Sequence, residues 1–462
     1  MSRTDVEARS SEPLSVGWRE LWLKEDWWAI WIGLGIVIVG YFLFAQGASL
    51  KWIAVTPAKW SSLLQLGADL SANALRYVAQ FFFWLALFGI ALTALGHKAR
   101  DFVPAFLFLY LVAVLIFVIG QWSEANYYNL EPPLVALLLG LVISNTIGLP
   151  RWLDAGFRVE FYVKVGIVLL GATLPFTLIL WAGPVAIIQA SLVSITTFLV
   201  IFFAARRLGL DRQLAATLGA GGAVCGVSAS IAVAGAVGAK KEYAPIAITV
   251  VVLWAIVMIF VLPFIARALN LPTGVAGAWI GTSEFADAAG FAAAQTYGGF
   301  AGHGVAGTAD QAVWSFTLMK VVGRDVWIGI WAFVLAIIST TRWEPAATGR
   351  KPDAAEIWWR FPKFVIGFLL ASIIITLVAR NYTQAAFTKQ VTPVLVAPIK
   401  DLRTWAFIFC FLSIGFTTRF RELAHAGQKP FAAFSIGVAV NVLLGFILSA
   451  YVFATHWQNL VH

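Results

Sequence analysis

Two clusters of charged side chains lie inside segments of the chain that are otherwise apolar, one with Glu284 and Asp287 and the other with Lys320, Arg324 and Asp325. Glu284 and Asp287 are three residues apart, and Lys320 and Arg324 are four residues apart, so each pair shares one face of a helix. A charge at the centre of a bilayer costs at least ~2.5 kcal/mol, so charged residues in membrane segments usually serve a function. We expect the two cations either to bind an anion or to hold two segments together through ion pairs with the two acids.

The acidic pair follows two hydroxyl side chains in the stretch GTSEFADAAG, which begins at Gly281. Thr282 or Ser283 is expected to cap a helix whose first turn carries Glu284. We expect Thr282 and Ser283 to contact a substrate, and Glu284 and Asp287 to bind a coupling ion, H⁺ or Na⁺.

A second stretch, LGAGGAVCGVSASIAV from Leu218 to Val233, concentrates small residues within an apolar run long enough to cross a bilayer. Each glycine weakens a helix by about 1 kcal/mol relative to alanine, so the cluster predicts a broken membrane helix. Lipid offers no partner to the released backbone groups, so such a break must line a cavity or be buried in protein. The candidate substrate ligands in this stretch are Gly221, Gly222, Cys225, Gly226 and Ser228. The alternative is that these small residues only allow close helix packing.

Composition places the chain among all-α polytopic membrane proteins. Its residues are 60% hydrophobic and 12% charged, whereas soluble domains have about 25% charged residues. About thirteen hydrophobic segments approach the ~20 residues that a crossing needs. Because the basic residues lie in short connections, the net charge of +9 indicates membrane topology rather than nucleic-acid binding.

Lysine and arginine counts predict the orientation. If every segment crosses, the regions on the side of the N-terminus hold 20 of these residues and the opposite side holds 9. The positive-inside rule then places the N-terminus in the cytoplasm and the C-terminus in the periplasm of a bacterial inner membrane. A hairpin at the broken segment would invert every later loop, unless the segment near Glu284 also turned back.

Two similar stretches indicate an internal repeat. GATLPFTLILWAG (residues 171–183) and GFTTRFRELAHAG (residues 415–427) share five of thirteen positions and fall on segments predicted to run in opposite directions. Inverted repeats with broken helices are typical of secondary transporters, while chance similarity between apolar helices is the alternative. The expected division is a cytoplasmic tail at 1–25, additional N-terminal helices at 26–125, a repeat core at 126–455 and a C-terminal tail at 456–462.

Two motifs resemble a bacterial membrane family named for sulfate export. LGLDRQLAATLGAGGAVCGVSASIA (residues 208–232) and IGFTTRFRELAHAGQKPF (residues 414–431) are similar to its signatures, within a resemblance that spans about 132–453. The resemblance implies two inverted repeats with crossed, unwound helices, and a transport domain that moves like an elevator against a scaffold, often in a homodimer. Phe285 and Ala286 stand where that family has a His-Glu pair, so the acids here are displaced to the flanking positions.

Together these observations predict a secondary transporter that exports a small inorganic or organic anion. The anion follows from free N–H groups at the broken helices together with Lys320 and Arg324, whereas a sulfur oxyanion or sulfonate follows from the resemblance alone. One alternative is a monovalent cation/proton antiporter in which Glu284 and Asp287 bind the ion. Another is a membrane-embedded enzyme with Cys225 as nucleophile, which is disfavoured because all five histidines fall in loops or at the C-terminus. No metal or cofactor is expected, and the lipid bilayer is the expected environment.

Overall fold

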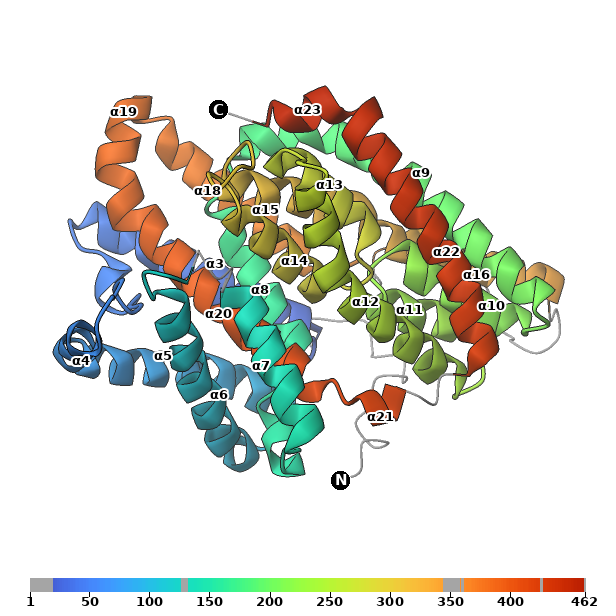
Figure 1. Ribbon diagram of the computed structural model, residues 1–462, viewed down its shortest axis with the longest axis horizontal. Coiled ribbons are helices and arrows are strands. Elements are labelled where there is room, and N and C mark those ends of the chain that lie inside the picture. Colours follow the sequence, from blue (N-terminus) through green and yellow to red (C-terminus); the bar gives the residue numbers. More distant parts are fainter. Residues whose placement is uncertain (1–19, 126–131, 344–357, 359–360, 424–426, 461–462) are drawn as a thin grey trace.

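The computed structural model describes residues 20–125, 132–343, 358, 361–423 and 427–460, and helices form its framework (Figure 1). Within that described part no sheet forms, seven helices are long and apolar enough to cross a bilayer, and three further apolar helices are shorter. The predicted all-α polytopic architecture is confirmed.

A first bundle gathers helices from distant parts of the chain. Its main members are α3 (Glu25–Ala45), α5 (Ala74–Ala94), α6 (Ala99–Gly120), α7 (Pro132–Thr146), α8 (Val159–Gly171), α18 (Phe364–Ala379) and α20 (Ala397–Thr417). Short elements accompany them: α2 (Glu20–Leu23), η1 (Leu50–Trp52), α4 (Leu63–Ala72), η2 (Arg151–Ala155), α19 (Gln384–Ala386) and η5 (Phe387–Val396). Aromatic rings fill the centre, where Phe88 lies 4.9 Å from Tyr162 between ring centroids. Gly140 of α7 and Gly415 of α20 let two backbones touch, because a Cβ on Gly140 would lie 2.8 Å from the Gly415 Cα.

A second bundle holds the remaining helices. Its members are α9 (Phe176–Arg207), α10 (Arg212–Ala223), α11 (Val227–Ala236), α12 (Tyr243–Ala268), α13 (Thr273–Ser283), α14 (Asp287–Gly299), α15 (Ala309–Thr317), η3 (Leu318–Arg324), α16 (Trp327–Ile338), η4 (Ser339–Trp343), α21 (Phe420–Leu423), α22 (Gln428–Ile447), η6 (Leu448–Val452) and α23 (Ala454–Gln458). The long helices α9 and α22 pack along each other on one flank (Figure 1). Trp331 of α16 stacks on Phe198 of α9 with ring centroids 3.9 Å apart.

The predicted break in the glycine-rich stretch is confirmed, and it forms the tip of a helical hairpin. Helix α10 ends at Ala223 and α11 begins at Val227, with Gly226 at a φ of 78° that favours glycine. Gln213 Nε2 donates a hydrogen bond to the carbonyl oxygen of Val237 at 3.4 Å, so the two outer ends of the hairpin lie together.

A second hairpin forms where the acidic pair lies. Helix α13 ends at Ser283 and α14 begins at Asp287. The Tyr297 hydroxyl donates to the carbonyl oxygen of Leu271 at 2.5 Å, which brings the end of α14 back to the start of α13. Glu284 is therefore the C-terminal cap of α13, with extended backbone angles, and not a residue of a helix's first turn as the sequence had suggested.

The two hairpins enter from opposite ends of the bundle and meet at their tips. Helix α12 connects them and runs the length of the bundle. Each half-helix has 10 to 13 residues, which corresponds to ~15–20 Å or about half of an apolar layer of ~30 Å. At the meeting point a Cβ on Gly226 would lie 2.4 Å from the carbonyl oxygen of Phe285. The tips thus touch near the middle of the bundle.

Both broken segments therefore turn back, although the sequence count had treated each as a crossing. The two reversals cancel, so later loops keep their predicted side. Lys240 and Lys241 join the side of the N-terminus and Arg267 leaves it, which changes the counts from 20 and 9 to 21 and 8. The charge bias in favour of a cytoplasmic N-terminus becomes slightly stronger.

The two repeat stretches lie at opposite ends of the molecule, as an inverted repeat requires. Arg403 Nη1 donates to Thr173 Oγ1 at 2.7 Å, so the first stretch lies beside the start of α20. The second stretch, residues 415–427, begins within the last turn of α20, and its residues 424–426 lie outside the described part. Each stretch leads from a first-bundle helix, α8 or α20, toward a long second-bundle helix, α9 or α22.

Candidate functional site

Lys320 lies on the helix that passes both hairpin tips, within η3, where the backbone forms a π-helical turn. Its Nζ donates hydrogen bonds to the carbonyl oxygens of Val224 at 2.9 Å and Glu284 at 2.8 Å, one in each break. The side chain is fully buried. A single ammonium group therefore joins the two tips.

Arg324 also binds the ends of α10 and α13, and it contacts more carbonyl oxygens than Lys320 does. Its Nη2 donates to the carbonyl oxygen of Gly222 at 2.9 Å, and its Nη1 donates to those of Thr282 at 2.6 Å and Glu284 at 3.1 Å. The last carbonyls of a helix have no partner within it and form the negative end of its dipole. Arg324 and Lys320 thus stabilise the C-terminal ends of α10 and α13 together, and their main partners are main-chain carbonyls.

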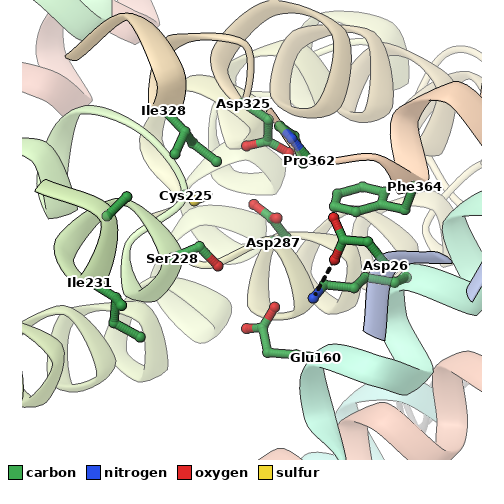
Figure 2. Close-up of a pocket in the computed structure, with 12 residues that line it drawn as sticks. Asp26, Glu160, Cys225, Ser228, Ile231, Asp287, Asp325, Ile328, Pro362 and Phe364 are labelled. Carbon is green, nitrogen blue, oxygen red and sulfur yellow. Dashed lines mark ion pairs between the residues drawn. The ribbon is translucent and has the colours of Figure 1, made fainter. Parts of the chain in front are cut away.

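A cavity of about 300 Å³ lies between the two bundles, beside the N-terminal ends of α3, α8 and α18 (Figure 2). Its lining consists of Asp26, Glu160, Lys164, Cys225, Ser228, Ile231, Ala232, Asp287, Asp325, Ile328, Pro362 and Phe364. Figure 2 shows Asp287 and Asp325 on the side of the hairpins and Asp26 and Glu160 on the side of the first bundle. The cavity is therefore built from helices that are far apart in the sequence.

Negative charge dominates this cavity. Four carboxylates line it and Lys164 is the single basic residue among the lining side chains. Lys164 Nζ is already paired with Asp26 Oδ1 at 2.9 Å, and Lys320 Nζ lies 3.7 Å from Asp287 Oδ1. In the described structure Asp287 Oδ1 and both carboxylate oxygens of Asp325 accept no hydrogen bond. Asp325 is fully buried, and a buried carboxylate without a hydrogen bond is costly, so a bound cation or proton would stabilise it.

Two helix N-termini also reach the cavity. Helix α11 begins next to Cys225 and Ser228, and no side chain caps its first N–H groups. Helix α14 begins at Asp287, and Glu284 Oε1 accepts from the N–H groups of Phe285 and Ala286 at 2.9 and 3.2 Å. The positive end of α11 is therefore open to a ligand, whereas Glu284 occupies the backbone donors before α14.

Three of the predicted site residues line the cavity: Cys225, Ser228 and Asp287. The other predicted residues do not line the cavity: Gly221, Gly222, Gly226, Thr282, Ser283, Glu284, Lys320 and Arg324. Close packing explains two glycines, because a Cβ on Gly221 would lie 2.5 Å from Ser230 Oγ and one on Gly222 would lie 2.3 Å from Ile201 Cδ1. Thr282 and Ser283 face α22, since a Cβ on Gly445 would lie 2.4 and 2.8 Å from their hydroxyl oxygens.

Four charged lining residues had no predicted role: Asp26, Glu160, Lys164 and Asp325. Lys164 and Asp325 are charges within apolar segments and satisfy the rule that selected the other charged residues. Asp26 and Glu160 lie in the first turns of α3 and α8. Acids are common in such first turns, so the sequence carries no signal for them.

The chain matches the family described as conserved hypothetical protein 698 over residues 104–434. A UPF0324 membrane protein from Rhodopirellula baltica is 32% identical over 425 residues, which cover 90% of this chain and 75% of the relative. One from Nitratidesulfovibrio vulgaris is 34% identical over 77% of this chain, which spans only 60% of that relative's length. One from Nitrosomonas europaea is 29% identical over 87% of this chain and 90% of the relative. No solved structure matches this chain. These descriptions name membrane proteins and state no substrate.

Proposed function

We propose that this chain, which belongs to the membrane-protein family described as conserved hypothetical protein 698, is a secondary transporter that exchanges a small cation for protons. The observation that carries the proposal is the cavity between the bundles, where four carboxylates face one lysine that is already paired. Two charges 4 Å apart interact by about 4 kcal/mol at an effective dielectric constant near 20, so a carboxylate in this cavity attracts a cation or a proton.

Exchange follows from the chemistry of a carboxylate. Both Asp325 oxygens lack a hydrogen-bond donor, and Asp287 Oδ1 has only the Lys320 ammonium at 3.7 Å. A carboxylate oxygen binds a proton or coordinates a cation but not both. Coupling ions of secondary transporters commonly bind at half-helix C-termini. Here Lys320 and Arg324 occupy those ends, which leaves the cavity carboxylates to bind the exchanged ions. The hairpin tips belong to the second bundle, so movement of that bundle against the first would carry Asp287 and Asp325 from one side toward the other and leave Asp26 and Glu160 behind.

A small anion is the second candidate substrate, and a sulfur oxyanion or sulfonate moved outward is the version that the motif resemblance suggests. The uncapped N-terminus of α11 at Cys225 and Ser228 favours it. An anion would enter only when cavity carboxylates are protonated, because otherwise like charges meet in a site of low dielectric constant. An enzyme with Cys225 as nucleophile is a weaker candidate, because no histidine is among the lining residues to act as its base.

Binding measured across pH separates the two transport candidates. We would follow the thermal stability of the purified protein with Na⁺, K⁺, sulfate, sulfite and a sulfonate between about pH 5 and 8, since a ligand of the native state stabilises it. Cation binding in competition with one proton tightens up to about tenfold for each unit rise in pH over the titrating range. Anion binding that depends on protonated carboxylates tightens as pH falls.

Two variants sharpen the result. Asp287→Asn should remove cation binding together with its pH dependence, because the neutral amide neither competes for a proton nor neutralises a cation. Asp154→Asn is the matched control, because Asp154 pairs with Arg419 at 3.0 Å away from the lining residues. If anion binding strengthens at low pH and no cation has any effect, cation exchange is rejected and anion transport becomes the proposed function. Binding of neither class would overturn the transport site itself.

A further inference from the structure

We infer that Asp26 of helix α3 determines the charge selectivity of the cavity by masking Lys164, an inference that rests on the proposed function. Asp26 Oδ1 lies 2.9 Å from Lys164 Nζ, and Asp26 Oδ2 accepts a hydrogen bond from the Lys363 backbone N–H at 2.8 Å. One carboxylate therefore joins α3 to α8 and to the start of α18. Figure 2 draws this ion pair on the wall of the cavity that faces Asp287.

The pair is positioned to control the field inside the cavity. Lys164 is the basic residue of the lining. Its side chain is 14% exposed, and the side chain of Asp26 is 21% exposed. With Asp26 in place the pair contributes no net charge, and the other charged lining residues are three acids, Glu160, Asp287 and Asp325, of which Asp287 lies 3.7 Å from Lys320. Without the Asp26 charge, Lys164 would lose its ion-pair partner in the same cavity. The net charge at the site would then rise by one unit.

Close packing holds Asp26 in this place. A Cβ on Gly33 of α3 would lie 2.5 Å from Val168 Cγ1 of α8, so the two helices touch about two turns of α3 beyond the ion pair. Helix α3 precedes residues 104–434, the region that the family description matches. A helix outside the matched region thus supplies a wall residue of the cavity, and it could adapt the selectivity of a shared core without changing the hairpin tips.

The effect of removing each charge of this pair is testable with four variants. Asp26→Asn should weaken cation binding by about tenfold or more and strengthen anion binding, because a unit charge acts over several ångströms at an effective dielectric constant near 20. Lys164→Gln should act in the opposite direction. The double variant Asp26→Asn/Lys164→Gln restores the wild-type net charge, and it should recover most of the cation affinity. Asp154→Asn removes an acid that pairs with Arg419 away from the cavity lining, and should leave both affinities unchanged.

The readout is the ratio of Na⁺ to sulfate affinity of each purified variant, together with its melting temperature. If Asp26 only anchors α3, both Asp26 variants should melt earlier with an unchanged ratio, and this result would overturn the inference. If the wild type binds sulfate and no cation, the proposed exchange of cations fails by itself. The inference then still requires Asp26→Asn to tighten sulfate binding, and an unchanged sulfate affinity in a folded variant would reject it.

Discussion

Removal of Arg324 should destabilise the protein more than it disturbs ion binding. The guanidinium is fully buried and makes three hydrogen bonds of 3.1 Å or less, to the carbonyl oxygens of Gly222, Thr282 and Glu284. Hydrogen bonds to charged groups contribute roughly 1.5–3 kcal/mol each, and burying the guanidinium offsets several kcal/mol of their sum. Arg324→Gln leaves carbonyls of both half-helices without a partner, so we expect a loss of about 3–5 kcal/mol.

The assay is equilibrium unfolding of the purified protein in mixed micelles by titration with a denaturing detergent. Arg324→Lys keeps the charge, but it has three donors on a narrower head group and should recover only part of the stability. Lys400→Gln is the matched control, because Lys400 pairs with Asp310 at 2.8 Å while both side chains are more than a third exposed. Exposed pairs contribute only about 0–1 kcal/mol.

Ion affinity of the folded fraction decides between the two roles of Arg324. If Arg324 only holds the backbone of the two tips, Arg324→Gln should lower stability, and the ion affinity of the folded protein should change little. The reasoning is refuted if Arg324→Gln unfolds within about 1 kcal/mol of the wild type and has lost ion binding, because Arg324 would then contact the ion directly.

Three further predictions concern the hairpins. Gly226→Ala should abolish transport and lower stability, because an L side chain is strained at a φ of 78° and would meet the main chain of the opposite tip. Gly35→Ala is the control and should be neutral, because the space around its Cβ is open. Labelling of Cys225 by a small polar thiol reagent in intact membranes should be slowed by the transported ion, and complete inaccessibility in a transporting protein would contradict a cavity at this tip. Cysteines substituted at Lys241 and His303 should be labelled from opposite sides of the membrane, with position 241 facing the cytoplasm, and labelling from one side would disprove the paired hairpins.

Local properties of the chain were sufficient to predict the helical class, the broken helix and the family. Apolar segments and clustered glycines act on the backbone where they occur, so the break between Ala223 and Val227 and the all-α architecture could be predicted. The inverted repeat was also visible, because similar residues at 171–183 and 415–427 occupy equivalent helix ends. A spacing of four residues correctly placed Lys320 and Arg324 together, whereas the shared helix face predicted for Glu284 and Asp287 is wrong, because α13 ends before Glu284 and α14 begins at Asp287.

Tertiary structure alone decided which partners those residues meet. Hydropathy is the same for a segment that crosses and for one that turns back, so the hairpins follow only from contacts such as Gln213 with Val237. Helical spacing gives the face of one helix and no information about the opposing surface. The carbonyl oxygens that Lys320 and Arg324 bind therefore lie up to 102 residues away in the chain. Asp26 reaches the cavity for the same reason, since packing of α3 on α8, and no feature of its own sequence neighbourhood, places its carboxylate beside Lys164.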